Sequence, residues 1–513
     1  MKSNNIKLLG ALAFLIGFSS CSNDNEEDVI VTTPLVPLNI TASYPQRVDG
    51  DVDFPQQNWK EENKLAALRT DKRTYDKSIL TWESANKFNG EIEHEIAENA
   101  RLAFFQPAEK YFANTNDTTT QTLLLNGQNG TANDIYQFDY LWGACDIKDN
   151  TTSVTGDFEA SALTGIYKFK FTNANGGTIN NISQIILTGL NDNFHQQATL
   201  DMKEGTLSNQ ASGSIRVSNA QGLNQEAYIA LFPYEGNIHF TLSTTDGKSY
   251  EGTTSESHAI EAGSFHVCEP IQCTELALAK IGDYYYDDAT WSTELNPAKN
   301  CIGIVYALEN ASGEIDRTAT ASNHGRIVAL KDCKKELIWS LSPGDIEDIA
   351  NIENLRDTLT HGKLPYFDGT ADSYFTEDKT HQMTEISINE QTGQITNWCT
   401  TGALSDFNGE TNASFINHNH SKYPAASYSA LFSEGITGWH LPALGDLALI
   451  WMLQQSGIIC ENSKEGFTNL DPFGYWSSTE HSEGEAWYIN FYSGNVVSNS
   501  KNSYYNVRTT FRF

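Results

Sequence analysis

Short runs of alternating apolar and polar residues recur along most of the chain and restrict it to folds that are rich in β-strands. The clearest run is the last one, in which Tyr505, Val507, Thr509, Phe511 and Phe513 alternate with polar or charged residues. A period of two is the pattern of a strand that buries one face. We therefore expect one continuous strand at the end of the chain, with Phe513 on the buried face of a sheet.

The length and the charge of the chain limit its class further. A chain of 513 residues is too long for a single hydrophobic core, so we expect about two to four domains. It contains 33 basic and 65 acidic residues, which gives a formal net charge of -32. This charge argues against nucleic acid as a partner, because phosphate groups are bound by a basic face.

The N-terminus has the features of a secretion signal. Lys2 and Lys7 precede an apolar run at residues 8–17, and Phe-Ser-Ser then leads to Cys21. No later run is apolar over the roughly 20 residues that a membrane span needs. Phe-Ser-Ser-Cys resembles a bacterial lipobox, which implies a lipid on Cys21; an ordinary signal peptide with a chance cysteine is the alternative.

An acidic segment at residues 22–28 follows directly, and its composition predicts a solvated tether. An acidic stretch behind a lipidated cysteine resembles the surface-export signal of lipoproteins in Bacteroidetes-like bacteria. This resemblance implies a lipoprotein of the outer membrane that faces outward and is held there by its lipid anchor.

Two series of short strand-like runs follow the tether. The first begins with residues 38–44 and continues into a polar turn at residues 45–50, which we expect to be exposed. Short strands separated by turn signals favour β-sandwiches in both series. Within the first series, residues 60–69 have a weak helical pattern. The further strand-like runs lie at residues 78–82, 101–105, 121–125, 135–142, 165–171, 182–187, 214–217, 227–232, 238–242 and 264–267.

The order of these runs resembles the fimbrillin family, the pilins of Bacteroidetes-type pili, over about residues 35–268. The matching segments are DIYQFDYLWGACDI, LTGIYKFKFTNANGGTINNISQIILTGL, AYIALFPYEGNIHFTLSTTDGKSYEG and IEAGSFHV. The resemblance implies two transthyretin-like β-sandwiches in series. It also implies that other pilin subunits are partners of this chain.

The same resemblance carries a proteolytic processing site to Arg47. In such pilins a protease cuts after an arginine that follows the first strand, and the segment ITASYPQRVDGD has Arg47 at this position. Loss of the first strand would open a groove for a strand donated by a neighbouring subunit. A simple polar turn is the alternative, and Arg69 and Arg73 also lie nearby.

From residue 274 onward the pattern changes to strands mixed with helices. Apolar residues recur at helical spacing over residues 441–457, and Gly457 would end this helix. A second helix is predicted over residues 342–352, where a serine that can act as the N-cap precedes a proline. This region therefore has the pattern of an α+β domain.

Six segments of this region resemble C-type-lectin-like domains of the kind that ends collagen-like bacterial adhesins. They are IGDYYYDDATWS, GIVYALE, HGRIVAL, GWHLPALGDLALIW, YWSSTEHSEGEAWYINFYSGNV and YYNVRTTFRF, in this order. The implied fold class is multidomain, with two all-β transthyretin-like β-sandwiches followed by an α+β C-type-lectin-like domain. The expected parts are a signal peptide at 1–20, an acidic tether at 21–37, sandwiches at 38–150 and 151–273, and the lectin-like domain at 274–513.

The lectin-like region contains the candidate ligand-binding residues. Aromatic faces beside carboxylates and amides are typical of sugar sites, because sugar rings stack on them and sugar hydroxyls form hydrogen bonds. Trp476 and Trp487 fit this chemistry but are better interpreted as core residues. No calcium-dependent sugar site is predicted, because the Glu-Pro-Asn and Trp-Asn-Asp signatures of such lectins are absent. The polar candidates are Glu480, Glu483, Glu485, Asn490, Asn506 and Arg508.

The cysteines suggest a structural use. Eight are present, and seven remain when Cys21 is set aside. Cys268 with Cys273, and Cys301 with Cys333, are candidates for disulfides in an oxidising compartment. None of them has the Cys-x-x-Cys spacing of a zinc or redox site.

No motif in the sequence nominates catalytic residues, a metal or a cofactor. A glycine-rich phosphate loop, a nucleophile elbow and a His-Glu-x-x-His motif are absent. His418 and His420 lie two residues apart without further ligands, which favours a polar loop over a metal site. We therefore expect that the chain is not an enzyme.

Together these features predict a surface-exposed lipoprotein that acts as the tip adhesin of a pilus, or fimbrium. The C-terminal domain would bind a glycan or a host surface protein, and the sandwiches would accept a donor strand. Because the last run belongs to the sheet of its own domain, we expect no spare strand for donation. The alternative is a surface glycan-binding lipoprotein that does not polymerise.

Overall fold

A computed structural model of the chain describes most residues between Leu35 and Phe513. Cys21, the acidic segment, and the pair His418 and His420 lie outside the described part. What is described is a multidomain protein rich in β-strand, with three short α-helices. These helices are α1 (Gly409–Ile416), α2 (Pro424–Leu431) and α3 (Leu444–Gln455). The described residues are 35–49, 52–54, 56–69, 78–93, 101–110, 120–149, 152–190, 194–255, 258–310, 312–342, 344, 346, 349–365, 383, 385–416, 422–432, 436 and 438–513.

A nine-stranded sheet contains the first strand of the described chain. Its order is β10-β11-β1-β6-β5-β4-β7-β9-β12, with β1 antiparallel to β6 and parallel to β11. The strands pack around a core that includes Leu80, Phe88 and Phe104. They are β1 (Leu35–Ser43), β4 (Lys64–Arg69), β5 (Ser78–Ser84), β6 (Lys87–Glu93), β7 (Arg101–Gln106), β9 (Leu141–Asp146), β10 (Lys148–Asp149), β11 (Val154–Glu159) and β12 (Ser161–Ala162).

A second group of strands forms three larger sheets, with the orders β19-β13-β24, β14-β25-β22-β21-β15-β18 and β17-β16-β8, and a two-stranded sheet of β20 (Tyr234–Gly236) and β23 (His258–Ile260). In the sheet β17-β16-β8, β8 from the first predicted sandwich pairs with β16 from the second. The strands are β8 (Thr120–Leu124), β13 (Gly165–Phe169), β14 (Phe171–Asn173), β15 (Ile182–Gly189), β16 (His195–Asp201), β17 (Leu207–Ser212), β18 (Ile215–Leu223), β19 (Ala227–Leu231), β21 (Ile238–Thr244), β22 (Ser249–Thr253), β24 (Phe265–Val267) and β25 (Ile271–Leu276).

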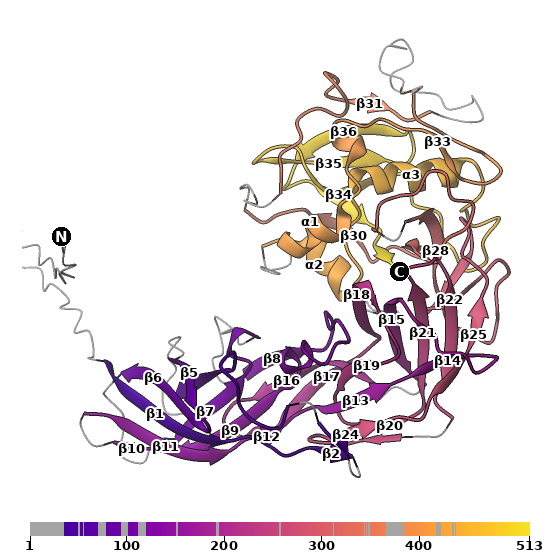
Figure 1. Ribbon diagram of the computed structural model, residues 1–513. Coiled ribbons are helices and arrows are strands. Elements are labelled where there is room, and N and C mark those ends of the chain that lie inside the picture. Colours follow the sequence, from indigo (N-terminus) through magenta and orange to yellow (C-terminus); the bar gives the residue numbers. More distant parts are fainter. Residues whose placement is uncertain are drawn as a thin grey trace, which may run out of the picture.

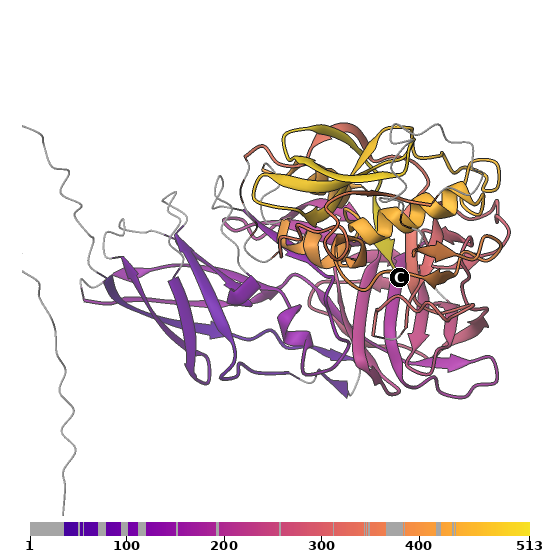
Figure 2. The ribbon, with the colours of Figure 1, turned by 90° about the horizontal axis from the view of Figure 1, so that it is seen from above.

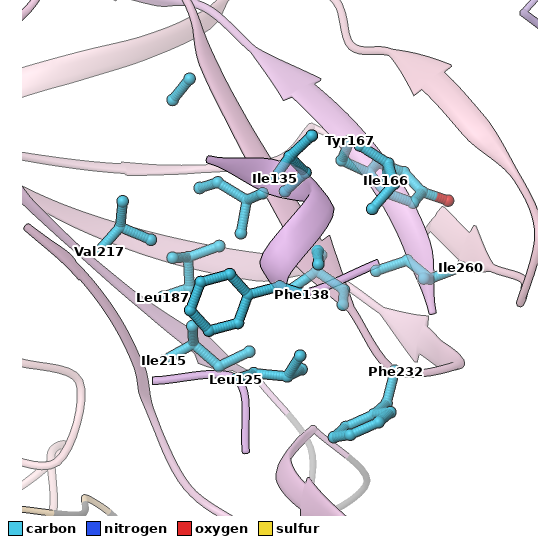
Figure 3. Close-up of a cluster of buried hydrophobic side chains, with 14 of the residues drawn as sticks. Leu125, Ile135, Phe138, Ile166, Tyr167, Leu187, Ile215, Val217, Phe232 and Ile260 are labelled. Carbon is cyan, nitrogen blue, oxygen red and sulfur yellow. The ribbon is translucent and has the colours of Figure 1, made fainter. Parts of the chain in front are cut away.

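These two groups of strands share one hydrophobic core. Figure 3 shows Leu125, Ile135 and Phe138, from the first predicted sandwich, among side chains of the second such as Ile166 and Leu187. Each of these five residues is at most 2% exposed. Strands on both sides of the predicted sandwich boundary, at residues 150 and 151, therefore contribute to the same hydrophobic core.

The described C-terminal region contains two large sheets, both in contact with α3, and a two-stranded sheet of β32 (Ser387–Ile388) and β33 (Ile395–Asn397). The helix that the sequence predicts at residues 441–457 is confirmed as α3, which buries Leu447 and Trp451. The sheet orders are β27-β26-β28-β29-β38 and β30-β37-β34-β35-β36-β31. The strands are β26 (Tyr284–Tyr286), β27 (Trp291–Ser292), β28 (Cys301–Leu308), β29 (Gly325–Ala329), β30 (Lys334–Ile338), β31 (Gly362–Lys363), β34 (Gly474–Glu480), β35 (Glu485–Asn490), β36 (Asn495–Ser500), β37 (Tyr504–Val507) and β38 (Thr510–Arg512).

The end of the chain differs from the single strand that the sequence predicts. β37 belongs to the six-stranded sheet, whereas β38 belongs to the five-stranded sheet. Between them, Arg508 and Thr509 are at most 1% exposed. The prediction of one continuous strand with one buried face is therefore wrong, because the segment crosses from one sheet to the other and residues 506–511, at the crossing, are all buried.

The second predicted helix, at residues 342–352, is not formed by the residues that the structure describes there. Backbone groups of this segment are instead bonded to the region around β34. The Gly344 N–H donates to the Glu483 carbonyl at 3.1 Å, and the Ile352 N–H donates to the Glu480 carbonyl at 3.0 Å. A single turn, in which the Ile349 N–H donates to the Ile346 carbonyl at 2.9 Å, remains between these tertiary hydrogen bonds.

The protein consists of an elongated limb with the C-terminal domain at one end (Figure 1). The first sheet extends away from this domain, and the second group of strands lies beneath it, as the view from above also shows (Figure 2). Ile186 of β15 packs in one cluster with Phe511 and Phe513 of the C-terminal domain. The Arg216 guanidinium lies 4.7 Å from the Phe511 ring centroid. The domain is therefore attached to the limb through a hydrophobic contact.

Candidate functional site

β1 lies in the interior of its sheet, where it has a bonded neighbour on each side. Leu38, Ile40 and Ala42 point into the core and are at most 2% exposed, whereas the residues between them are exposed. The indole N–H of Trp59 donates to the Ala42 carbonyl at 2.6 Å. Removal of β1 would therefore expose both a row of backbone hydrogen-bonding groups and a row of apolar pockets.

Arg47, the predicted processing site, is buried. It is 1% exposed, forms an ion pair with Asp139, and lies 5.6 Å from the ring centroid of Phe54. The Tyr44 hydroxyl donates to the same carboxylate at 2.7 Å. Burial raises the pKa of Asp139 above its ordinary value, although the Arg47 guanidinium and the Tyr44 hydroxyl each lower this pKa. The expectation of an exposed turn is wrong at this residue, because the buried carboxylate holds the guanidinium inside.

The chain after Arg47 is also held in place. It forms a short hairpin of β2 (Val48–Asp49) and β3 (Val52–Asp53). The Asp49 carboxylate accepts a hydrogen bond at 2.7 Å from the backbone N–H of Val267, in the second group of strands. A protease would therefore reach the peptide bond after Arg47 only when this segment opens locally.

Glu480, a predicted ligand residue, lies at the end of β34 and has a structural partner. Glu480 and Lys501 form a salt bridge, and both side chains are 0% exposed. The Lys501 ammonium also donates to the carbonyls of Gly344 and Glu483, at 3.1 and 2.8 Å, and lies 4.9 Å from the Trp339 ring centroid. Glu480 is therefore not available at the surface for a ligand.

Asn506 and Arg508 are buried as well, at 5% and 1% exposure. The Asn506 side-chain oxygen accepts from the Glu336 N–H at 3.2 Å. Arg508 Nε donates to Asp332 at 2.7 Å, and its other nitrogens donate to two backbone carbonyls at 3.0 Å. Both residues hold the crossing between the two sheets, which is a structural role.

The other three candidates lie nearer to the surface but at different ends of the hairpin. Glu483 is exposed in the connection between β34 and β35, and Glu485 begins β35. Asn490 ends the same strand, where its side-chain oxygen accepts from the N–H groups of Tyr492 and Ser493 at 3.0 and 3.1 Å. Five strand steps separate the two ends by roughly 16 Å. The predicted residues therefore do not converge on one site.

An aromatic surface that the sequence reasoning missed lies on the face of the six-stranded sheet opposite α3, next to the core that α1 and α2 cover. The rings of Tyr488 and Tyr505 stack with centroids 4.1 Å apart, and both residues are partly exposed. A Cβ atom at Gly474 would lie 2.3 Å from the Tyr505 ring, so the strand between them needs a glycine. The Asn499 amide donates to the Tyr505 hydroxyl at 2.7 Å.

Two further aromatic rings are exposed at the end of the same hairpin. Phe473 and Tyr492 are 64% and 61% exposed, and they flank the paired residues Gly474 and Asn490. The sequence signal was the alternation in β35, where Tyr488 and Asn490 lie on the face opposite Trp487. Trp476 and Trp487 are both fully buried, which confirms that they are core residues.

A cleft of about 470 Å³ separates the C-terminal domain from the second group of strands. Both arginines that line the described part of this cleft have carboxylate partners. Glu410 lies 3.8 Å from Arg216 and 3.4 Å from Arg512, and Arg512 also donates to Glu309 at 2.6 Å. The pair Arg216–Glu410 joins the limb to the C-terminal domain, whereas the two pairs of Arg512 lie within that domain.

The seven described cysteines are free thiols, so the predicted disulfides are absent from this structure. Cys268 follows β24 and Cys273 lies in β25, which belong to different sheets. Cys301 and Cys333 pack against different core clusters. Burial raises the pKa of Cys268, Cys273 and Cys333 to about 12 and that of Cys301 to about 11. Such thiols are poor nucleophiles.

Within the residues that the structure describes, no group of three or more His, Cys, Asp or Glu side chains could hold a metal ion. Among the helices of the described ranges, none has the length and hydropathy needed to cross a membrane.

Comparisons with known proteins found one family model that matches the C-terminal domain and several solved structures that are similar to larger parts of the chain. The family model of the Lcl C-terminal domain matches residues 329–510. No curated protein matches this sequence. A fimbrial protein from Bacteroides ovatus aligns at 14% identity over 93% of this chain and 98% of its own, with a TM-score of 0.29. The C-terminally truncated tip fimbrial protein Mfa3 from Porphyromonas gingivalis aligns at 11% identity over 47% and 99%, with a TM-score of 0.25.

Proposed function

We propose that this chain is a surface adhesin of a pilus, anchored in the outer membrane through a lipid on Cys21. In this proposal its limb accepts a strand from another pilin subunit in place of β1, and its C-terminal domain contacts a host glycan or protein. A position at the tip of the filament is part of the same proposal.

The observation that carries the proposal is the setting of β1. A strand with inward apolar side chains and bonded edges on both sides leaves a groove when it departs. An exposed row of backbone groups beside apolar pockets is what an added strand recognises. The domain boundaries at residues 38–150, 151–273 and 274–513, and the lectin-like nature of the last domain, are part of the same proposal.

Arg47→Ala is expected to leave β1 attached in cells, because the proposed protease cuts after a basic residue. Mass spectrometry of protein isolated from the cell surface measures this: the substituted chain should keep the segment from Cys21 onward, and the unsubstituted chain should begin at Val48. Arg101→Ala, at an exposed arginine, is the matched control and should be processed normally. An unsubstituted chain that still begins at Cys21 would count against processing.

The proposed ligand surface is the aromatic face of the C-terminal domain. The stacked pair Tyr488 and Tyr505 lies beside Asn499, and Phe473 and Tyr492 are exposed at the same hairpin. Rings that offer a flat face beside amide groups suit the C–H faces and hydroxyls of sugars. This arrangement supports a glycan as the ligand.

Removing the exposed rings is expected to abolish glycan binding without unfolding the domain. The double substitution Phe473→Ala with Tyr492→Ala deletes two side chains that are more than 60% exposed. We expect at least a tenfold loss of signal from the full chain on a glycan array, since each stacked ring contributes on the order of 1 kcal/mol. Tyr428→Ala, at an exposed tyrosine on α2, is the control. Equal binding by the double variant and the control would exclude this surface.

A surface glycan-binding lipoprotein that does not polymerise is the second candidate, and the burial of Arg47 favours it. A protease needs local opening of the segment before it can cut there, and without the cut β1 would stay in the sheet. Electron microscopy of sheared surface material separates the two candidates. Immunogold label for this chain at filament ends supports the pilus adhesin, whereas label that remains on the cell body supports the second candidate.

A further inference from the structure

We propose that the groove beneath β1 selects a donor strand that carries a cation at the position of Arg47. The inference rests on the proposed function, since it describes the strand that replaces β1. It follows from a carboxylate, Asp139, that stays in the limb when the cleaved segment leaves. The partner is thus an extended, alternating strand with a basic residue at a fixed place.

The partners of Asp139 belong to the segment that departs. Asp139 is 1% exposed and precedes β9. Among the described residues, the groups that bond its carboxylate are the Arg47 guanidinium and the Tyr44 hydroxyl. Cleavage after Arg47 would release both of them together with β1. The limb would then contain a carboxylate without its partners, and a strand that enters the groove would bury it again.

An unpaired buried charge is costly, so the strand that enters the groove must restore its partner. A strand that is only apolar fills the pockets but leaves the carboxylate unpaired, and an acidic strand adds repulsion. A cation three residues beyond the position of Tyr44 restores the ion pair. The groove therefore selects a donor strand by its charge as well as by its shape. A strand with the basic residue binds more tightly than other strands of alternating apolar and polar residues.

The apolar pockets of the groove also limit the size of the side chains that a donor strand can insert. Leu38 and Ile40 fill large pockets, whereas Ala42 is fully buried at a position opposite Phe158 of β11. A larger side chain at the Ala42 position would overpack this site. The donor strand that fits best has two large apolar residues, a small one and an aromatic residue with a hydroxyl at alternate positions, followed by the cation.

The test uses the full chain with a site for a sequence-specific protease inserted in the turn between β2 and β3. After cleavage, β1 stays in its groove without a covalent link and can be exchanged. A labelled peptide with the sequence LVPLNITASYPQRVD is bound in its place and is then displaced by unlabelled competitors. The competitors are the same peptide, its Arg47→Gln form and its Arg47→Glu form.

We expect the Arg47→Gln peptide to compete at least about a hundredfold less well than the unmodified peptide, and the Arg47→Glu peptide to be weaker still. In an Asp139→Asn chain the difference between the unmodified and Gln peptides should fall below about threefold. Equal potency of all three peptides on the unsubstituted chain would overturn charge selection but leave strand acceptance intact. Failure of even the unmodified peptide to enter would overturn strand acceptance, and with it the proposed function.

Discussion

Glu480→Ala is expected to destabilise the C-terminal domain strongly. Both members of the Glu480–Lys501 salt bridge are 0% exposed, so the substitution leaves an ammonium group buried without its counter-charge. Loss of one partner of a buried pair costs about 3–5 kcal/mol. For a domain of this size that corresponds to a fall in Tm on the order of 10 °C. Differential scanning calorimetry of the full chain measures the shift.

Two further variants test whether the loss of stability comes from the unpaired charge of Lys501. Glu483→Ala removes an exposed carboxylate from the same connection and should change the stability by less than about 0.5 kcal/mol. Glu480→Met combined with Lys501→Met should be less destabilising than Glu480→Ala alone, because no unpaired charge remains. If Glu480→Ala left the Tm unchanged and reduced ligand binding instead, Glu480 would be a ligand residue, as its sequence position suggests.

The strand-rich architecture and α3 could be predicted because each depends on a local period. The alternation of Leu38, Ile40 and Ala42 appears directly as the buried face of β1. Leu447 and Trp451 repeat at helical spacing and both face the core from α3. β1 and α3 could therefore be predicted without knowing which distant segments pack against them, because each element buries one face against one core.

Residues 60–69 show where a local period fails. The segment has a weak helical pattern, yet its second half forms β4. Leu65 and Ala67 pack into the core of the nine-stranded sheet, whereas Ala66 and Leu68 pack into the core shared with the second group. A strand buried on both faces has no alternation, so its apolar run cannot be distinguished from part of a helix by period alone.

Three of the candidate ligand residues are buried instead of exposed, for a related reason. Polar residues in a loop-like sequence are usually exposed, and Glu480, Asn506 and Arg508 were interpreted in this way. Each of them is buried because a partner from a distant segment satisfies it, such as Lys501 for Glu480 and Asp332 for Arg508. Pairing across 21 or 176 positions leaves no local signal. Arg47 with Asp139 is the same case in the limb.

The aromatic surface was missed although its residues were visible in the sequence. Tyr488 and Tyr505 belong to strands that are not adjacent in the chain, and Gly474 of β34 separates them. The sequence shows each tyrosine on an alternating run but not that a glycine lets the two rings meet. Knowledge of the strand order β37-β34-β35 is what reveals the pair.

Arg508→Ala is expected to have a second large effect, because it removes the connection between the two C-terminal sheets. The guanidinium pairs with Asp332 and donates to the carbonyls of Ala329 and Thr468. The substitution leaves a nearly buried carboxylate and two carbonyls without these donors, which should cost about 3–5 kcal/mol. Urea denaturation followed by tryptophan fluorescence should show a lower midpoint for the C-terminal transition.

The variant Arg508→Lys shows how much of the stabilisation comes from the positive charge and how much comes from the planar shape of the guanidinium. A lysine keeps the positive charge for Asp332 but cannot reach all three acceptors with a planar fork, so its midpoint should lie between those of the alanine variant and the unsubstituted chain. Arg317→Ala, at an exposed arginine of the same domain, should leave the midpoint unchanged. If Arg508→Ala and Arg317→Ala had the same midpoint, Arg508 could not be holding the sheets together. Its role would then have to be sought in ligand binding. The buried crossing between β37 and β38 would be stabilised by the packing of Val507 and Phe511 and by the hydrogen bonds of Thr509, which accepts from the Ala329 N–H at 3.1 Å and donates to the His440 carbonyl at 2.9 Å.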